Sequence, residues 1–237
     1  MPPILTWHFN RERRKLAALP RAMIPAAAVR ERILKRYRLL PAWPRMFAYG
    51  KLRYDNLFTE LKQKLSGWPN PKKILDIGCG YGLPACWLAE YFPDLHIFGC
   101  DPDPERVFFA QRAVAERGKM LIGAAPDLPE KFPGGCDLAL LLDMAHYLSD
   151  EQLRATFRRC RELLHEHGGL LVRFVIRPAA RPSFSWRFED LKSRAAGLST
   201  HYRALDEMTA IAKAAGFGTA TIEPSANTDM FWLTAIS

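Results

Sequence analysis

The sequence predicts an α/β protein in which a mostly parallel sheet carries helices on both faces and follows a helical extension. From Lys72 onward, short apolar stretches typical of strands alternate with helical stretches, the pattern of a parallel sheet with right-handed crossovers. A glycine-rich turn, residues 78–82, follows the first of these strands. Residues 1–66 carry 15 Lys/Arg and 4 Asp/Glu, whereas residues 67–237 carry 19 and 21. The basic charge therefore belongs to the extension, and the main domain is nearly neutral.

The extension is expected to be helical. Over residues 26–40 four apolar residues recur at helical spacing, and prolines follow them: Val29, Ile33, Tyr37 and Leu40, then Pro41 and Pro44. A second helix is expected over residues 45–65, before a boundary rich in Gly and Pro at 67–71. Residues 1–70 are accordingly predicted to form a basic helical extension or lid, and residues 71–237 the main domain.

The main domain is predicted to contain seven strands with helices between them. The expected strands are 74–77, 95–101, 120–124, 136–143, 170–176, 219–222 and 230–235. The fourth is a continuous apolar run, as in a parallel sheet that is buried on both faces. The last two strands are predicted to form a closing antiparallel pair. A long polar and aromatic segment, residues 177–202, is expected to be functional because long connections in compact domains often are.

The glycine turn and the acid before it indicate a ligand site. Gly78, Gly80 and Gly82 allow positive φ and leave no Cβ between backbone and ligand, and the turn opens onto a helix N-terminus. Asp76 stands at the end of the first strand, two positions before Gly78. A carboxylate there repels a pyrophosphate but can hold an ammonium group. This argues against a dinucleotide and for a nucleotide that bears an amino acid.

A second acid supports this interpretation. Asp101 closes the second strand, 19 positions after Gly82 (101 − 82). A βαβ unit places the carboxylate that binds ribose hydroxyls at about this distance from the turn. A glycine turn that only serves packing in another α/β protein, such as a dehydrogenase, is the alternative.

The motifs Asp76-Ile77-Gly78-Cys79-Gly80-Tyr81-Gly82 and Gly99-Cys100-Asp101-Pro102-Asp103 resemble those of the class I, Rossmann-like S-adenosylmethionine-dependent methyltransferases. The resemblance runs from Lys72 to the C-terminus. It implies the seven-stranded methyltransferase sheet, S-adenosylmethionine as cofactor, and N-terminal helices that cover it, with Tyr49, Lys51 and Tyr54 as lid residues. The cofactor-binding residues that it implies are Asp76, Gly78, Cys79, Gly80, Tyr81, Asp101, Pro102, Ala125, Asp127 and Asp143.

One position departs from the family pattern. Ala124 stands where an aspartate usually follows the glycine after the third strand. Either Asp127 replaces that aspartate, or the adenine is held by backbone and apolar contacts.

Residues after the fourth strand are candidates for chemistry, because ligands of open α/β sheets sit beyond the strands' carboxyl ends. His146 is the candidate catalytic base, since histidine exchanges protons near neutral pH. The alternative is a histidine that only packs near the cofactor. Arg173 is expected either to bind an acceptor carboxylate or to pair with Asp143. Phe184 and Trp186 of the long segment suit an apolar or aromatic acceptor.

These features predict a methyltransferase that acts on a small organic acceptor, at oxygen. A second hypothesis is methylation of RNA, protein or a lipid-linked acceptor, recruited by the basic N-terminus through contact with nucleic acid or an anionic membrane. Nucleic acid is less favoured, because the sequence contains no recognisable RNA-binding module. The Asn-Pro-Pro-Tyr-type tetrapeptide that family members acting on planar nitrogens often carry after the fourth strand is also absent. A third hypothesis is a non-catalytic cofactor-binding module, which only Ala124 favours.

Composition bounds the class of protein. Apolar residues make up 49% and charged residues 25% of the chain, as in globular proteins. Neither a transmembrane run nor a secretory signal is expected. The five cysteines are scattered and form no CxxC pair, so we expect no metal site and no disulfide framework. A reducing, cytoplasmic location is predicted.

Overall fold

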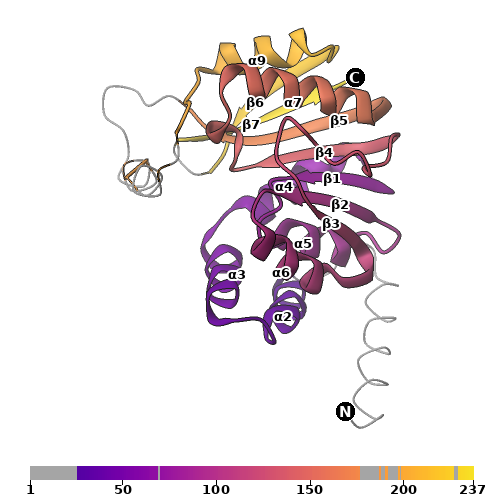
Figure 1. The fold of residues 1–237 in the computed structure, drawn as a ribbon, viewed down its shortest axis with the longest axis vertical. Helices are drawn as coiled ribbons and strands as arrows, with labels where there is room; N and C mark the ends of the chain where they lie inside the picture. Colours follow the sequence, from indigo (N-terminus) through magenta and orange to yellow (C-terminus); the bar gives the residue numbers. More distant parts are fainter. Residues whose placement is uncertain are drawn as a thin grey trace.

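The computed structural model describes residues 26–68, 70–176, 187, 190–191, 197, 199–226 and 229–237. Phe184 and Trp186, the predicted aromatic walls of the acceptor site, lie outside the described residues. A single sheet crosses the molecule, with helices on both of its faces (Figure 1).

The sheet has seven strands in the order β3-β2-β1-β4-β5-β7-β6. The strands are β1 (Lys73–Ile77), β2 (His96–Asp101), β3 (Gly118–Ile122), β4 (Cys136–Leu142), β5 (Leu164–Val175), β6 (Thr219–Pro224) and β7 (Met230–Ile236). The β1 to β5 neighbours pair in parallel, while β7 runs antiparallel to both β5 and β6. The chain reverses its direction of travel across the sheet between β1 and β4, the switch point at which such sheets bind ligands. The predicted fold class is thereby confirmed.

Helices form a layer on each face of the sheet (Figure 1). The helices are α2 (Ala26–Tyr37), α3 (Ala42–Tyr54), α4 (Leu57–Lys64), α5 (Leu83–Tyr91), α6 (Pro104–Val114), α7 (Asp150–Leu163) and α9 (Leu205–Ala214). The helices α2 to α6 pack on one face in one apolar cluster, and α7 and α9 pack on the other face in a second. No described helix is both long and apolar enough to cross a bilayer.

The apolar stripes of the sequence locate the core correctly. Val29, Ile33, Tyr37 and Leu40 are all buried, and β4 is buried along nearly its whole length. The five cysteines are buried and form no disulfide, so they act as small apolar side chains. Strand ends differ modestly from the expected ones. β3 begins two residues earlier than predicted, and β5 begins at Leu164 because this residue pairs with Cys136 beyond a bulge.

The N-terminal helices belong to the same core as the sheet. The Tyr37 hydroxyl of α2 donates to the Tyr81 carbonyl in the glycine turn at 2.6 Å. Arg32 and Arg36 of α2 pair with Glu90 of α5 at 2.6 and 2.8 Å. Part of the basic charge of the extension is therefore neutralised by the main domain rather than solvated. The division of the chain at residue 70 stays a prediction.

The single helix predicted over residues 45–65 is wrong. Two helices occupy this stretch, and Asp55 between them is extended (φ −95°, ψ 131°). The Asp55 carboxylate accepts the Leu57 backbone N–H at 2.8 Å and contacts two cations, Lys51 and Arg173. These contacts hold the carboxylate outside a continuous helix, and the chain turns over the carboxyl ends of the strands at this point.

The second of these helices is tied to the closing hairpin of the sheet. Glu60 of α4 accepts hydrogen bonds from the Trp232 indole, the Ser225 hydroxyl and the Ala226 backbone at 2.7–2.8 Å. Lys64 pairs with Glu223 of β6. The α3–α4 unit thus spans the sheet from the glycine turn to its far edge.

Candidate functional site

The glycine turn joins β1 to α5 at the carboxyl edge of the sheet. All three glycines have positive φ, at 75°, 53° and 73°, as the spacing predicts. The Gly78 and Cys79 amides donate to the Cys100 carbonyl at 2.8 and 2.9 Å, and the Gly80 amide donates to Asp101 at 3.0 Å. Because these N–H groups are already bonded to β2, the turn offers little to a phosphate. This agrees with a ligand other than a dinucleotide.

The glycines of the turn have different surroundings. A Cβ on Gly82 would lie 3.0 Å from Ala110 of α6, so this position serves close helix packing. A Cβ on Gly80 would meet nothing within 4 Å. The open side of the turn, where a ligand can lie against the backbone, is therefore at Gly80.

Asp76 is a buried carboxylate without compensation. Its side chain is 1% exposed, and neither oxygen has a hydrogen-bond partner among the described residues. Burial, with a smaller contribution from Asp101, raises its pKa to about 7. An unpaired buried carboxylate is costly, and a cationic ligand group would remove that cost.

Asp101 closes β2 next to the turn and is also buried. One carboxylate oxygen accepts from Gly80 and the other from the Asp103 backbone N–H at 3.1 Å. Asp103 in turn caps α6 through the Glu105 and Arg106 amides. These bonds fix the orientation of Asp101 at the edge where the turn opens.

The other predicted cofactor residues surround this edge with different exposure. Tyr81 packs against Phe47 of α3, with ring centroids 5.3 Å apart, so the extension contacts the turn itself. Pro102 and Asp127 are exposed, and Ala125 is half-buried. The Gly123 amide donates to the Asp101 carbonyl at 3.2 Å, which places the segment after β3 beside Asp101.

Asp143, after β4, lies in a cluster of four charges contributed by the extension and the sheet. Lys51 of α3 donates to Asp143 at 2.7 Å and to Asp55 at 2.5 Å. Arg173 of β5 contacts Asp55 at 2.8 Å and Asp143 at 3.3 Å. We call these residues the charge cluster; two cations face two carboxylates, so it is neutral. The sequence left the role of Arg173 open, and the structure shows pairing with acids.

The charge cluster shifts the pKa values of Asp55 and Lys51 toward their charged forms. Burial alone would raise the pKa of Asp55, but Lys51 and Arg173 lower it below the ordinary value. Burial alone would likewise lower the pKa of Lys51, and Asp143 and Asp55 raise it instead. Of the predicted lid residues, only Lys51 reaches the strand ends, whereas Tyr49 and Tyr54 are exposed.

His146 lies in a single 3-10 turn, Ala145–Tyr147, beyond Asp143. It is buried between two rings: Tyr147, with centroids 4.1 Å apart, and Tyr202, stacked at 5.8 Å. The His201 backbone N–H donates to the His146 carbonyl at 2.7 Å. The end of the long segment 177–202 therefore lies alongside the predicted catalytic residue.

Arg203 is a positioning residue that the sequence analysis missed. It is buried and donates to the Ala145 and Leu148 carbonyls at 3.1 and 2.6 Å, on both sides of His146. It also pairs with Asp150 at 2.9 Å. A single arginine between a loop and a helix gives no sequence signal for such a role.

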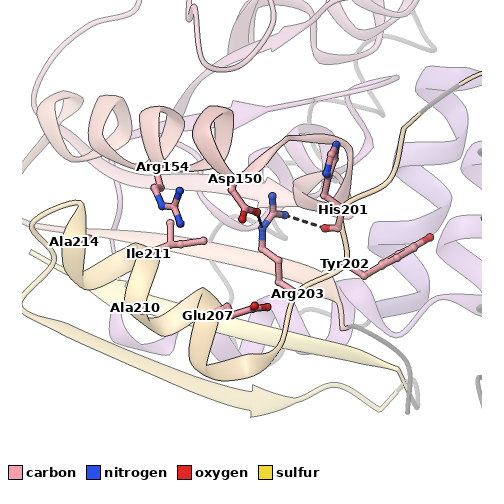
Figure 2. A pocket seen from close by; sticks show the side chains of 9 residues that line it. All are labelled: Asp150, Arg154, His201, Tyr202, Arg203, Glu207, Ala210, Ile211 and Ala214. Carbon is pink, nitrogen blue, oxygen red and sulfur yellow. Dashed lines mark hydrogen bonds and ion pairs between the residues drawn. The ribbon is translucent and has the colours of Figure 1, made fainter. Parts of the chain in front are cut away.

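A cavity of roughly 520 Å³ opens between α7 and α9, behind this turn. Figure 2 shows Arg203 reaching between Asp150 and His201 along its wall. The remaining wall residues are Arg154, Tyr202, Glu207, Ala210, Ile211 and Ala214. None of the predicted cofactor residues lines this cavity, so it is separate from the glycine turn.

Comparison with known proteins agrees with this geometry. Residues 74–168 match the family described as methyltransferase domain. The chain is 27% identical to phenazine O-methyltransferase of Lysobacter antibioticus over 168 residues, 66% of this chain and 46% of that protein. It is 34% identical to 3-O-methylredipecamine 2-O-methyltransferase of Carapichea ipecacuanha over 119 residues, 49% of this chain and 30% of that protein. The chain thus spans less than half of either relative.

Solved structures show the same fold. PigF with S-adenosylhomocysteine superposes with a TM-score of 0.64 at 19% identity, covering 82% of this chain and 58% of that one. Residues 74–168 are therefore similar to the methyltransferase-domain family, and the chain has the fold of the class I, Rossmann-like S-adenosylmethionine-dependent methyltransferases, as the sequence resemblance predicts.

The buried Asp76 carboxylate should make the stability of the ligand-free protein depend on pH. The pKa of Asp76 is about 7 in the folded chain and 3.8 unfolded, so the folded state holds the proton longer. Stability from this group is fully present below pH 3.8 and is lost as the pH rises to about 7. Asp76→Asn should therefore be more stable than wild type at pH 8, by up to about 4 kcal/mol without ligand, and should match it near pH 4. Urea unfolding at both pH values tests this, and a difference that does not depend on pH would contradict it.

The charge cluster predicts a graded series of destabilisations. Lys51→Met leaves Asp143 and Asp55 with one cation, and because the Lys51 side chain is 26% exposed we expect a loss of about 1–2 kcal/mol. Arg173→Met, at 1% exposure, should cost about 3–5 kcal/mol. Lys35→Met breaks only the exposed pair with Glu31 and should change stability by less than about 0.5 kcal/mol. Urea unfolding ranks the three variants, and equal effects for Lys51 and Lys35 would argue against a cluster.

Proposed function

We propose that this chain is an S-adenosylmethionine-dependent methyltransferase that transfers a methyl group to oxygen of a small organic acceptor. The observation that carries the proposal is the buried Asp76 carboxylate, which has no hydrogen-bond partner among the described residues and stands in β1 just before the turn that is open at Gly80. The cationic ammonium of a methionine group would compensate this carboxylate, and the backbone at Gly80 leaves room for the ligand.

The three acids at the strand ends suit different parts of this cofactor. Asp101, oriented by two backbone amides, suits the ribose hydroxyls, because a fixed carboxylate accepts two hydroxyl donors well. Asp143 is already neutralised by Lys51 and Arg173, so its contact with the methionine portion would be a neutral polar one. We therefore assign the ammonium to Asp76.

The remaining assignments complete the proposed cofactor site. Gly78, Cys79, Gly80 and Tyr81 would line the methionine side, and Pro102, Ala125 and Asp127 the adenosine side. The cofactor, when bound, supplies a methyl group on a sulfonium, a good leaving group. The chain then has to orient donor and acceptor and exclude water. Phe47 of the extension contacts Tyr81 of the turn. This contact supports a role for the extension as a cover over the cofactor site.

The acceptor class rests on the relatives. Two curated relatives are named as O-methyltransferases, one of a phenazine and one of 3-O-methylredipecamine, and a third is named as a demethylmenaquinone methyltransferase. An acceptor hydroxyl loses a proton during attack, so a base helps. His146 is the residue at the strand ends suited to this task, and Arg203 holds its turn in place.

Cofactor binding is tested by calorimetry with S-adenosylmethionine and S-adenosylhomocysteine. We expect micromolar binding by wild type and a weakening of about 1–2 kcal/mol in Asp101→Ala, the value of a charge-assisted hydrogen bond. Asp76→Asn should weaken binding of both ligands, and it should also abolish the rise in affinity from pH 6 to pH 8 that ionisation of Asp76 gives wild type.

Asp94→Asn is the matched control, because it removes an exposed carboxylate before β2 that contacts Lys72 at the surface. It should bind both ligands like wild type. If wild type binds neither ligand, the proposed function is wrong.

The base is tested with phenols and alcohols as acceptors. His146→Ala should lower kcat by about 10²–10⁴ and leave cofactor affinity nearly unchanged, while the neighbouring Tyr147→Phe should retain most activity. Circular dichroism controls for folding. A loss of kcat below tenfold would assign His146 to packing alone.

The same assays distinguish the alternative functions. A chain that binds the cofactor but methylates none of a broad acceptor panel would favour the non-catalytic module. Methylation of RNA or protein that depends on the basic residues before residue 67 would favour the macromolecular reading. We also retain the cytoplasmic location as a proposal, since it rests on the unpaired cysteines alone.

A further inference from the structure

Helix α3 carries a second apolar face that points away from the core. Pro44, Ala48 and Leu52 form the buried face. On the other side, apolar or aromatic side chains recur at helical spacing, and Leu39 adds to them one turn earlier. We call this set the α3 outer face: Leu39, Trp43, Met46 and Tyr54. Leu39 is 81% exposed, Trp43 and Met46 are 65% exposed, and Tyr54 is 77% exposed.

This exposure is unusual for one short segment. Single exposed apolar side chains need no explanation, but contiguous ones mark interaction sites. α2 and α3 also form the periphery of the molecule on their side of the sheet (Figure 1). No described helix or strand covers the α3 outer face.

The charges around the outer face have one sign. Between residues 32 and 54 there are seven Lys/Arg and no Asp/Glu. Four of the seven make ion pairs: Arg32, Lys35, Arg36 and Lys51. The other three, Arg38, Arg45 and Arg53, are exposed and form no ion pair within the described part of the chain. The Arg53 guanidinium lies 5.9 Å from the Tyr54 ring, directly on the outer face.

We infer that the α3 outer face docks the protein on an anionic membrane surface. Trp, Tyr, Leu and Met side chains suit the boundary between headgroups and acyl chains. Arginines beside them match the negative charge of anionic lipid headgroups. The absence of any acid over residues 32–54 removes the repulsion that would oppose this contact. The inference concerns binding alone and does not depend on the proposed methyl transfer.

A second copy of the chain fits this face less well. A two-fold contact places the same patch on both subunits, so Arg38, Arg45 and Arg53 would face arginines without an acid between them. Nucleic acid fits the arginines, but the exposed apolar side chains of Leu39 and Met46 offer it nothing.

The test is flotation of the full chain with vesicles of phosphatidylcholine alone or mixed equally with phosphatidylglycerol. We expect binding to the anionic vesicles only, with a loss at high salt. Arg45→Gln with Arg53→Gln should lower the partition coefficient about 25-fold, or about fivefold for each arginine removed. Trp43→Ser with Met46→Ser should lower it at least about tenfold. All four side chains are exposed, so thermal unfolding should be unchanged.

The control is Arg158→Gln with Lys213→Gln, which removes two exposed charges from α7 and α9 on the opposite face of the sheet. This variant should bind vesicles like wild type. Equal binding to both kinds of vesicle, or an equal loss in the control, would overturn the inference. So would a dimer in sedimentation equilibrium that Trp43→Ser and Met46→Ser dissociate, or an RNA shift without vesicle binding.

Discussion

The neutral cluster of Lys51, Asp55, Asp143 and Arg173 is the constraint on which the arrangement of the site depends. It joins α3, the α3–α4 turn, the end of β4 and β5 at one point. Asp143 has a left-handed backbone (φ 60°), which is costly outside glycine. The ion pairs and the bond from its N–H to the Arg173 carbonyl at 3.0 Å offset that cost. The turn that carries His146 begins directly after this fixed residue.

The acids at the strand ends show how stability and ligand binding are separated. Asp143 is ion-paired with Lys51 and Arg173, and Asp101 accepts hydrogen bonds from backbone amides. Asp76 is buried next to them without a hydrogen-bond partner among the described residues. A buried carboxylate without a partner reduces the stability of the ligand-free fold. Such a residue is retained where a ligand supplies the missing partner. Of these three acids, Asp76 contributes least to folding, and we therefore expect it to contribute most to cofactor binding.

Local patterns in the sequence were sufficient for the fold and for the glycine turn. Positive φ at Gly78 and Gly80 follows from residue type and spacing, and the buried stripes follow from helical and strand periods. The charge cluster could not be predicted, because Lys51 and Asp143 are 92 positions apart and carry no shared motif. Tyr202 stacks on His146, and Arg203 bonds to carbonyls on both sides of it, across a similarly long stretch of sequence. One local signal was available: the Asp55-Asn56 pair is typical of a turn and argued against a continuous helix.

Helix α3 connects the two surfaces to which we assign binding. Its inner side supplies Lys51 to Asp143 and Phe47 to Tyr81, at the edge where the cofactor residues lie. Its outer face carries Trp43 and Met46, and the exposed side chains of Arg38, Arg45 and Arg53 lie in the same segment. A membrane contact that favours one position of α3 would shift the cover of the cofactor site by the same free-energy difference, and binding of the cofactor would strengthen docking in return. A single rigid helix suffices for this coupling, so no longer pathway through the sheet is required.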